Sequence, residues 1–585
     1  MNDGNDPDDP DDPYVLGGPQ PHDFWAESVA DLVLDRVLDP DSNSHTDADP
    51  GPDDPIVIKG GISPSGVPHL GNMNEIARGY FVAEALRDQG RTVRQVFTAD
   101  DRDPLRRVPR KLADLDGNVV GLDSVDAGAL GRNLGKPYTA IPDPFGCCDS
   151  YGAHFSNLVE RSADLVAFPV ETISNTELYE SGEFEDVTRH LLEHREQART
   201  VLANYQEKVN NDYVPFRPIC ADCGHVTETN AVRSVDMEAG TVTYVCADVE
   251  AGDRTIEGCG HEGTATFREG KLPWRFEWPA QWQVLGVDFE PFGKDHAEGS
   301  WPSGVDISRN VLGETPPVPM AYEWFTLDGE AFSSSEGHVV MVQDVLEFLE
   351  PEVLRYFFTK NPSRARDFSV TRADQLVDEF DAFERTYFDA ATSSVLSDET
   401  TGDGQQNDGP QDDEASGARA AYPAVVGSVA DRPIRLPYTF AAVLGMTDDV
   451  DLREAMARRE GHLPDAATEK VVETALARVE YARTWAKRTD NAYNYRLATD
   501  LPAVEFDRAT EAALDDLAAA VAAGHDGEEI QSEIFETARD HDLDPGELFT
   551  AGYRLLFGTE QGPKLGPFLA ELDREFVVER LRREA

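Results

Sequence analysis

The spacing of apolar residues divides the chain into a mixed α/β part and an all-helical part. After about Pro55 the β-branched run PIVIK leads into the turn GGISPSGVPHLGN. A segment with apolar residues at helical spacing follows, MNEIARGYFVAEALRDQG, and then the strand candidate TVRQVFTAD. This order predicts a β-α-β unit. Further strand candidates are DLVAFPV, VLGVDFEPFG and PVPMAYEWFTL.

Beyond about residue 363 the apolar positions recur only at helical spacing. The amphipathic stretches are QLVDEFDAFERTYFDAA, TEKVVETALARVEYARTWAKR, RATEAALDDLAAAVAAG, EEIQSEIFETARDH and FLAELDREFVVERLR. They predict an all-helical carboxyl-terminal third. Two low-complexity segments, residues 1–13 and 397–417, show no apolar period, and we expect both to be solvated and mobile.

Charge is the feature of the composition that changes this picture. The chain has 585 residues, too many for one hydrophobic core, and it carries 111 acidic against 52 basic residues, a formal net charge of −59. Because 40% of the residues are hydrophobic, the acid excess indicates a folded protein with an acidic surface. Such a surface fits a cytoplasm with molar salt, where repulsion is screened within about 3 Å. The alternative is an acidic protein of a low-salt cell.

The sequence shows no sign of export or membrane insertion. No apolar run reaches the length of a membrane-spanning helix. The first residues, MNDGNDPDDPDDPY, are acidic rather than a basic segment followed by an apolar one. We therefore expect a cytoplasmic protein without a membrane partner.

The turn at residues 60–72 is the first candidate site. In an open α/β sheet such a turn lies at the carboxyl edge of the strands, where ligands bind, and the helix amino terminus suits phosphate. His69 can place its imidazole on a polyphosphate, while Gly71 lets the ligand approach closely. The turn lacks the lysine of a Walker loop and the spacing of a dinucleotide fingerprint.

Four of the six cysteines have a spacing that suits zinc. Cys220 and Cys223 form a Cys-x-x-Cys pair, and Cys246 and Cys259 supply two more thiolates for a tetrahedral structural ion. The twelve residues between Cys246 and Cys259 must form an excursion that leaves both sulfurs facing one ion. The alternative is unpaired or packed thiols.

The other two cysteines lie in DPFGCCDSYGAHF. Asp143, Cys147, Cys148 and His154 offer a carboxylate, two thiolates and an imidazole, which suit a second zinc site of mixed ligands. Adjacent cysteines can share a metal only where a loop or helix start bends the backbone. Surface or packed side chains without a metal are an equally open alternative.

Several motifs together carry a resemblance to a known family. PSGVPHLGN resembles the His-Ile-Gly-His signature of class I aminoacyl-tRNA synthetases, and it is most similar to the class I lysyl-tRNA synthetases, in which asparagine stands last. DFWAESVADLVLDR, ADDRDPLRRVPR, IPDPFGCCDSYGAHF, LPWRFEWPAQWQVLGVDFEPFGKDHAEG and AFSSSEGHVV follow in that family's order and span nearly the whole chain. With the acidic composition, they indicate a member from a halophilic archaeon.

The resemblance implies a fold and a domain order. The fold is an α/β Rossmann-like catalytic core of the class I type, with a zinc-bearing insertion and an all-α carboxyl-terminal region that binds the anticodon. The implied order is an acidic disordered leader at 1–20, the first half of the core at 21–140, the insertion at 141–270, the second half of the core with the signature loop at 271–362, and the helical region at 363–585 with the acidic insert 397–417.

The resemblance also implies roles for residues of this sequence. ATP would be bound by His69, Gly71, Asn72, Gly293 and Asp295, and lysine by Gly61, Ser63, Trp274, His296 and Tyr322. An aromatic box attracts an ammonium group by about 1 to 2 kcal/mol when desolvated. The alternative for Trp274 and Tyr322 is core packing. Asp143, Cys147, Cys148 and His154 would hold one zinc ion, with Cys148 at a position associated with histidine, and the four later cysteines would hold another.

One motif departs from the family. The second signature, Lys-Met-Ser-Ser-Ser-Lys-Gly, reads AFSSSEG at residues 331–337, so neither lysine is present. Those lysines would neutralise charge on the transferring phosphates. We expect the hydroxyls of Ser333, Ser334 and Ser335 to supply that stabilisation together with His69, Asn72, backbone amides, Mg²⁺ and K⁺.

The implied activity is ATP-dependent attachment of L-lysine to tRNA(Lys) through a lysyl-adenylate. The cofactors would be ATP, Mg²⁺ and Zn²⁺, and we expect a monomer. The helical region would read the anticodon, with Tyr493, Tyr495 and Arg496 as candidates for base contacts. Three alternatives stay open: a small-molecule adenylyltransferase, a non-catalytic RNA-binding paralogue and a synthetase specific for glutamate.

Overall fold

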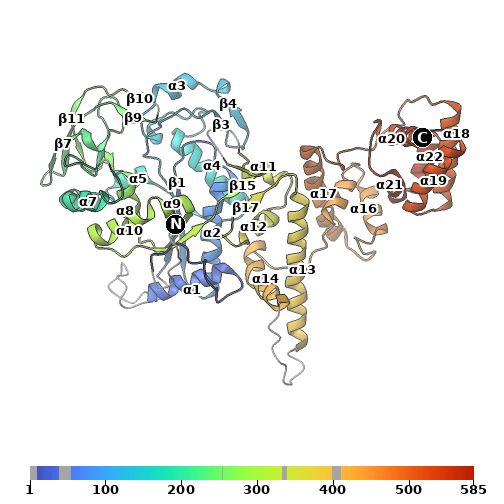
Figure 1. Cartoon of the computed structure of the whole chain (residues 1–585), viewed down its shortest axis with the longest axis horizontal. Coiled ribbons are helices and arrows are strands. Elements are labelled where there is room, and N and C mark those ends of the chain that lie inside the picture. Colours follow the sequence, from blue (N-terminus) through green and yellow to red (C-terminus); the bar gives the residue numbers. More distant parts are fainter. Residues whose placement is uncertain are drawn as a thin grey trace. The chain divides into compact units, whose positions relative to one another are not determined.

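The computed structural model describes residues 10–38, 54–207, 209–252, 254–332, 339–397 and 410–584. The chain forms two compact units. Unit 1 comprises Met1–Val345, Leu354–Ser369 and Asp389–Ser428, and unit 2 comprises Leu346–Val353, Val370–Phe388 and Val429–Ala585. The described strands all belong to unit 1, and the helices at the red end of the colour scale belong to unit 2 (Figure 1).

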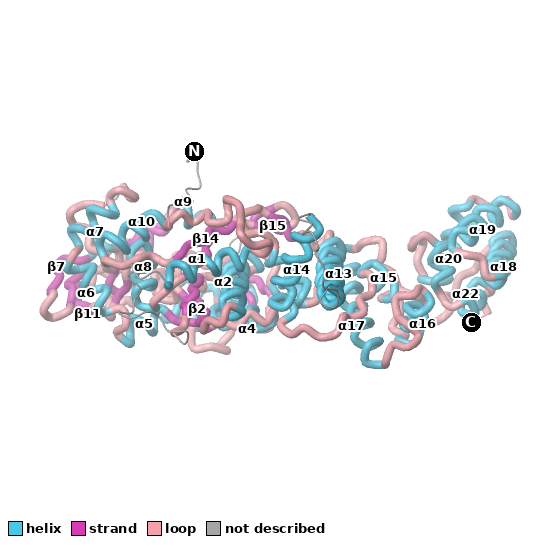
Figure 2. Tube along the Cα trace, turned by 90° about the horizontal axis from the view of Figure 1, so that it is seen from below, coloured by secondary structure: helices cyan, strands magenta, loops and turns pink. Residues whose placement is uncertain are grey.

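Unit 1 is built on a five-stranded parallel sheet with the order β14-β13-β1-β2-β5. The strands are β1 (Ile56–Ile62), β2 (Val93–Ala99), β5 (Glu171–Ser174), β13 (Phe289–Gly293) and β14 (Val318–Tyr322). β13 and β14 are buried along their whole length, as parallel strands are when helices cover both faces of the sheet. Figure 2 shows these strands among helices of the same unit. The predicted α/β core is confirmed.

The predicted β-α-β unit consists of β1, α2 (Leu70–Asp88) and β2. β1 and β2 pair in parallel over the whole length of both strands. Helix α2 packs closely on the sheet because Gly79 has no side chain: a Cβ there would lie 2.8 Å from the side-chain nitrogen of Gln95. This packing sets the amino terminus of α2 at the carboxyl edge of the sheet.

The segment between β2 and β13 holds many short elements. Its helices are α3 (Ala127–Arg132), α4 (Tyr151–Leu165), α5 (Asn175–Ser181), α6 (Glu185–Glu193), α7 (Arg195–Leu202) and α8 (Trp274–Leu285). Its strands besides β5 are β3 (Lys111–Ala113), β4 (Val119–Gly121), β6 (Arg217–Pro218), β7 (Val232–Asp236), β8 (Thr241–Val245), β9 (Val249–Ala251), β10 (Arg254–Ile256), β11 (Glu262–Thr266) and β12 (Gly270–Lys271). β6 pairs with β12, so the cysteine-bearing module between them begins and ends at adjacent strands.

The other elements of unit 1 lie before and after this segment in the sequence. They are α1 (Trp25–Leu38), α9 (Lys294–Glu298), α10 (Trp301–Ile307), β15 (Phe325–Leu327), β16 (Glu330–Ala331), β17 (Arg366–Phe368) and α14 (Pro410–Val426). Short turns of other helix types span Leu122–Ser124, Tyr138–Ala140, Thr229–Ala231 and Ser308–Leu312. Helices α11 (Val342–Leu346), α12 (Pro351–Thr359) and α13 (Ala373–Ser397) have residues in both units.

The strand predicted for DLVAFPV does not form. Helix α4 runs to Leu165, the chain turns at Ala167 with a φ of +51°, and β5 begins only at Glu171. Val166 and Phe168 are buried just after the helix rather than in the sheet. A short apolar run does not distinguish these two ways of burying its side chains.

Part of the acidic leader expected at 1–20 is ordered. The carbonyl oxygen of Pro13 accepts a hydrogen bond from the N–H of Ala321 on β14 (2.7 Å), and that of Asp11 accepts one from the indole of Trp301 (2.8 Å). β14 is an edge strand, so its outward N–H groups need partners. Residues 1–9 lie outside the described part of the chain.

Two other segments differ from expectation. Residues 410–417 of the predicted insert 397–417 belong to α14, while residues 398–409 lie outside the described part. The stretch FLAELDREFVVERLR forms two helices, α21 (Leu565–Glu571) and α22 (Arg574–Leu581). The division occurs because the Asp573 carboxylate accepts the N–H of Phe576 and caps the second helix.

Among its described residues, unit 2 contains helices and loops but no strand, as predicted. Its remaining helices are α15 (Tyr438–Leu444), α16 (Val450–Arg459), α17 (Glu469–Thr489), α18 (Arg508–Ala523), α19 (Gly527–Asp540) and α20 (Pro545–Phe557). Aspartate carboxylates cap five helices at Asp449, Asp507, Asp526, Asp544 and Asp573. Part of the acid excess thus stabilises helix amino termini, by about 0.5 to 2 kcal/mol each. Among the described helices of the whole chain, none is both long and apolar enough to cross a membrane.

A buried ion cluster joins separate segments of unit 2. Arg478 on α17 is 3% exposed and donates to Glu350 (2.5 Å), to both carboxylate oxygens of Asp381 (2.7 and 2.9 Å) and to the carbonyl oxygen of Leu436 (2.8 Å). One guanidinium therefore pairs with two buried carboxylates that would otherwise oppose folding.

Replacing Arg478 by methionine should lower the free energy of unfolding by about 3 to 5 kcal/mol, because Glu350 and Asp381 then lack a cation. Urea unfolding in molar KCl measures this value. The control is Arg483→Met on the same helix, which removes a partly exposed guanidinium and should cost about 1 kcal/mol or less. Equal losses in the two variants would contradict a structural role for the buried cluster.

Candidate active site

A cavity of about 550 Å³ lies where the carboxyl ends of β1, β13 and β14 meet the amino terminus of α2. Its lining includes all the predicted ATP residues, His69, Gly71, Asn72, Gly293 and Asp295. It also includes four of the predicted lysine residues, Gly61, Ser63, His296 and Tyr322. The fifth, Trp274, lies beside the lining: its ring is 5.9 Å from that of His296 and is stacked on Trp278 (5.4 Å, 14°).

His69 is the residue immediately before α2. Its backbone is extended (φ −127°, ψ 169°), and its N–H donates to the side-chain oxygen of Asn72 (2.9 Å), which fixes the first turn of the helix. The imidazole Nδ1 is buried and has no hydrogen-bond partner within the part of the chain that the structure describes. Burial lowers the pKa of His69 to about 4, so the ring is neutral at physiological pH and offers a single N–H to an anion.

Glu75 is the site residue that the sequence analysis missed. Its side chain lines the cavity, where Oε1 accepts the N–H of Gly61 (2.6 Å) and Oε2 accepts the hydroxyl of Tyr322 (3.0 Å). Burial raises the pKa of Glu75 to about 7, and the nearby Glu290 carboxylate contributes to the shift. The available signal is spacing, because His69, Asn72 and Glu75 are three residues apart and share one side of the helix.

A buried ion pair lies next to Glu75. Lys59 on β1 donates to the Glu290 carboxylate on β13 (2.7 Å), and the indoles of Trp278 (3.0 Å) and Trp282 (2.5 Å) on α8 donate to the same group. These donors satisfy Glu290 within the protein. Glu75 is therefore the carboxylate of the two that can receive a cation from the cavity.

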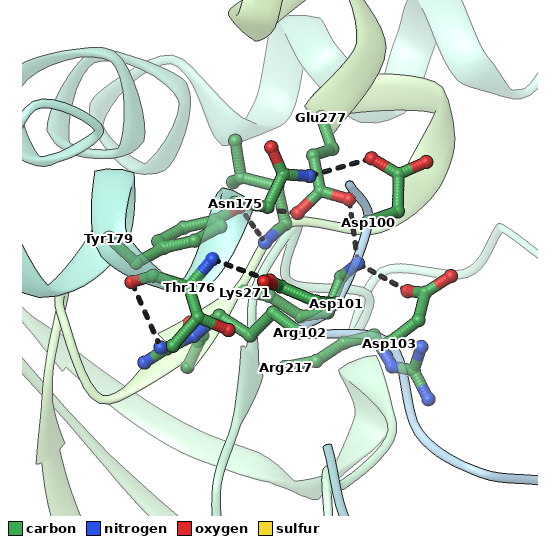
Figure 3. Close-up of polar contacts among 12 residues, drawn as sticks. Asp100, Asp101, Arg102, Asp103, Asn175, Thr176, Tyr179, Arg217, Lys271 and Glu277 are labelled. Carbon is green, nitrogen blue, oxygen red and sulfur yellow. Dashed lines mark hydrogen bonds and ion pairs between the residues drawn. The ribbon is translucent and has the colours of Figure 1, made fainter. Parts of the chain in front are cut away.

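A buried polar network anchors α8, the helix beside the cavity (Figure 3). Glu277 on this helix accepts hydrogen bonds from Lys271 (2.6 Å) and from the hydroxyl of Tyr179 (2.8 Å). Asp100, at the end of β2, accepts one from Gln281 (3.0 Å), and burial raises the pKa of Asp100 to about 8. The network joins β2, α5, β12 and α8, so the aromatic residues of α8 keep a fixed place relative to the sheet.

The predicted catalytic serines cannot be placed. Ser333, Ser334 and Ser335 lie outside the described residues, and their role stays a prediction. Ala331 and Phe332, which come just before them, line the cavity. The second signature therefore begins at the same cavity as the first.

The four later cysteines converge. The sulfur atoms of Cys220, Cys223, Cys246 and Cys259 all lie within 4.8 Å of one another. Two of the S···S distances are 3.6 Å, from Cys220 to Cys259 and from Cys223 to Cys246. A tetrahedral zinc ion with bonds of about 2.3 Å sets sulfurs about 3.8 Å apart, so the donor set fits zinc. The hairpin of β9 and β10 lies between Cys246 and Cys259, and it brings the chain back to the other cysteines.

The mixed donor set converges as well. Its ligand atoms lie within 4.8 Å of one another and belong to Asp143, Cys147, Cys148 and His154. Gly146, with a φ of +71°, bends the backbone just before the adjacent cysteines. The ring atom Nε2 of His154 lies 2.8 Å from the carbonyl oxygen of Ala113; donation there leaves Nδ1 as the atom that faces the other ligands. This set also fits a zinc ion.

The candidates for tRNA contacts line a smaller cavity of about 290 Å³ in unit 2. Its lining consists of Ala442, Gly445, Arg483, Ala486, Lys487, Tyr493, Asn494, Tyr495 and Arg496. The Asp448 carboxylate pairs with the guanidinium groups of Arg483 (2.7 Å) and Arg496. The Tyr495 ring packs edge-on against the Phe557 ring, with the centroids 5.0 Å apart, so Tyr495 contributes to packing within unit 2.

The fold and the cavity together define a class I aminoacyl-tRNA synthetase. A parallel sheet presents the His69 turn to a cavity, a segment with two donor sets that fit zinc interrupts the sheet, and helices follow it. In agreement, the family model described as "tRNA synthetases class I (K)" matches residues 24–404.

Curated relatives narrow the class to one family. The chain is 63% identical to a lysine–tRNA ligase of Haloarcula marismortui over 571 residues, which cover 97% of this chain and 99% of that protein. It is 64% identical to the corresponding ligase of Halobacterium salinarum (96% and 97% covered) and 31% identical to that of Pyrococcus furiosus (91% and 97% covered). The chain belongs to the class I lysine–tRNA ligases.

The two donor sets should bind zinc independently. Protein purified without chelators should carry two zinc ions per chain, and either Cys220→Ser or Cys147→Ser should lower the content to one, because each change removes a ligand from one set. Elemental mass spectrometry of the purified protein measures the content. Each variant is the control for the other, and loss of both ions from a single variant would contradict two separate sites.

Proposed function

We propose that this protein attaches L-lysine to tRNA(Lys) in an ATP-dependent reaction. The observation that carries the proposal is a cavity lined at one end by His69, at a helix amino terminus, and at the other by the partly buried carboxylate of Glu75, in a chain that belongs to the lysine–tRNA ligases. The named relatives are ligases for lysine, which argues against a small-molecule adenylyltransferase, a non-catalytic paralogue and glutamate specificity.

The reaction would run in two steps, with ATP and Mg²⁺ implied by the family. The carboxylate of lysine attacks the α-phosphorus of ATP in line, the bond to the bridging oxygen breaks, and pyrophosphate leaves with that electron pair. The 2′-hydroxyl of the terminal adenosine of tRNA then attacks the carbonyl carbon of lysyl-adenylate. AMP leaves and the hydroxyl proton is released. The protein supplies positioning and charge stabilisation rather than a nucleophile.

The helix terminus would serve the phosphates. His69 is neutral and would offer an N–H to the phosphates from its place just before α2. Asn72, Gly71, Gly293 and Asp295 would complete the ATP site, with the Asp295 carboxylate suited to ribose hydroxyls. Ser333, Ser334 and Ser335 would add hydroxyl donors where the family signature has flanking lysines.

The other end of the cavity would select lysine. The side-chain ammonium would meet the Glu75 carboxylate, and the ring of Tyr322 would face the same group. Gly61, Ser63 and His296 would shape the pocket, and Trp274 would support it through its contact with His296. A glutamate side chain would bring a second carboxylate to Glu75 and be repelled.

The remaining features would support this reaction. Zinc at either donor set would cross-link the loops that carry its ligands. In unit 2, the cavity at Tyr493, Tyr495 and Arg496 would receive an unstacked anticodon base, with the basic groups near a phosphate. We also propose a monomer that works in a cytoplasm of high salt.

The direct test is transfer of labelled lysine to tRNA(Lys) in multi-molar KCl with Mg²⁺ and ATP. Acid-precipitable label should appear with lysine and with full-length tRNA only. Charging with a different amino acid, or none in the presence of folded protein, would contradict the proposal.

Glu75→Gln should raise the KM for lysine by about 10- to 100-fold, because a charged hydrogen bond to the ammonium is lost. Because the pKa of Glu75 is raised, the KM for lysine should depend on pH. In the wild type the carboxylate forms as pH rises through about 7, so the KM for lysine should fall over that range. The variant should lose this dependence, and its KM for ATP should not change.

Steady-state kinetics of charging between pH 6 and 8.5 provides the measurement. The matched control is Glu298→Gln on α9. This change also replaces a carboxylate by a carboxamide, but Glu298 is exposed and does not line the cavity. A variant at Glu75 that keeps the wild-type KM and pH profile would show that another group recognises lysine.

The proposed contact of tRNA with the cavity at Tyr493, Tyr495 and Arg496 predicts a distinct pattern of changes in the KM for tRNA. Tyr493→Leu should raise the KM for tRNA by about 5- to 100-fold, while Tyr493→Phe should stay close to the wild type because a phenyl ring still stacks on a base. Lys487→Glu should also raise it, and Lys470→Glu, the same charge change at the other end of α17, should not. Equal effects of the two lysine variants would indicate general repulsion of RNA instead of a local contact.

A further inference from the structure

Phe332 makes a directional contact inside the active-site cavity. It follows the hairpin of β15 and β16, lines the cavity, and stands where the family signature has methionine. Its ring is stacked on the imidazole of His69, with the ring centroids 5.0 Å apart and the planes inclined by 18°. Stacked rings hold one another in a preferred orientation, which a flexible aliphatic side chain does not impose.

Among the described residues, no hydrogen bond holds the His69 imidazole at its Nδ1 edge. Nδ1 of His69 is buried without a hydrogen-bond partner among the described residues. This edge lies over Gly71: a Cβ there would be 2.7 Å from Nδ1 and 2.8 Å from Cε1. The ring therefore occupies the space that the missing side chain of Gly71 leaves, and its plane is set by packing against Phe332.

Phe332 is itself braced by the core of unit 1. Phe325 meets it edge-to-face at 5.4 Å and meets Phe357 in the same way at 5.4 Å. Phe357 continues the contact to Phe368 at 5.3 Å. Phe325, Phe357 and Phe368 are all buried. A continuous series of rings thus links the imidazole of His69 to the hydrophobic core.

We propose that Phe332 is a positioning residue for adenylate formation, which acts by holding the His69 imidazole in the plane that presents its N–H to the phosphates of ATP. The proposal rests on the proposed function, because it requires His69 to contact ATP. The same stack covers one face of the imidazole and so adds to the desolvation that keeps the pKa of His69 low. Since the signature has lost both lysines, the orientation of this one donor carries more of the phosphate stabilisation.

A double-mutant cycle in the full-length protein tests the proposal. The assay is lysine-dependent exchange of labelled pyrophosphate into ATP in molar KCl, with tRNA(Lys) present. Phe332→Leu should lower kcat by about 2- to 10-fold without changing the KM for lysine, and Phe332→Tyr, which keeps the ring, should restore kcat to within about twofold. In a His69→Ala background, Phe332→Leu should change kcat by less than about twofold, because the group it orients is gone.

The matched control is Phe267→Leu, the same substitution at a buried ring of unit 1 that lies outside this series and outside the cavity lining. It should lower the unfolding temperature and leave kcat within about twofold of the wild type. Circular dichroism establishes that each variant is folded. An equal loss of kcat from Phe332→Leu with and without His69 would overturn the proposal, since Phe332 would then act on its own. A rise only in the KM for ATP would also overturn it and assign Phe332 to the nucleotide. Inactivity of the wild type towards lysine would instead contradict the proposed function.

Discussion

The position of the Glu75 carboxylate is the constraint on which the active site depends. It is held by the N–H of Gly61 and the hydroxyl of Tyr322, so one side chain connects β1, α2 and β14 at the cavity. The contact requires glycine at position 61, because a Cβ there would lie 2.4 Å from the hydroxyl of Thr98. A carboxylate in this setting is costly to ionise unless a cation joins it. In the proposed reaction, the ammonium group of lysine would be that cation.

A cytoplasm of high salt, as proposed above, would favour recognition at short range. In molar salt, charges more than about 3 Å apart are largely screened, so a surface field cannot guide lysine or tRNA to the protein. Groups inside a cavity are screened less. In this chain Glu75 lines the cavity and the pair Lys59–Glu290 is buried beside it, whereas other acidic residues lie on the surface and cap helices. His69 fits the same scheme as a neutral donor whose effect depends on contact.

The sequence predicted the features that are local in the chain. The strand, turn and helix around His69 and the spacing of the cysteines are set by neighbouring residues, and the structure brings the same residues together. Glu75 escaped prediction because its contact with Tyr322 joins residues far apart in the sequence, and its spacing from His69 and Asn72 was the only local signal. DLVAFPV was wrongly predicted to be a strand. A short apolar run can be buried in a sheet or just after a helix, and its pattern does not distinguish the two. The ordered part of the leader depends on the free edge of β14, which no local pattern reveals. Ser333, Ser334 and Ser335 stay predictions.

Proton release on lysine binding tests the central claim most directly. With a pKa of about 7, a fraction of the Glu75 carboxyl groups carries a proton at pH 7, and binding of the ammonium should ionise them. Calorimetric titration of lysine at pH 7, in buffers with different ionisation enthalpies, should therefore show a net release of protons on binding. Lysine binding without proton release would contradict recognition by a partly protonated Glu75.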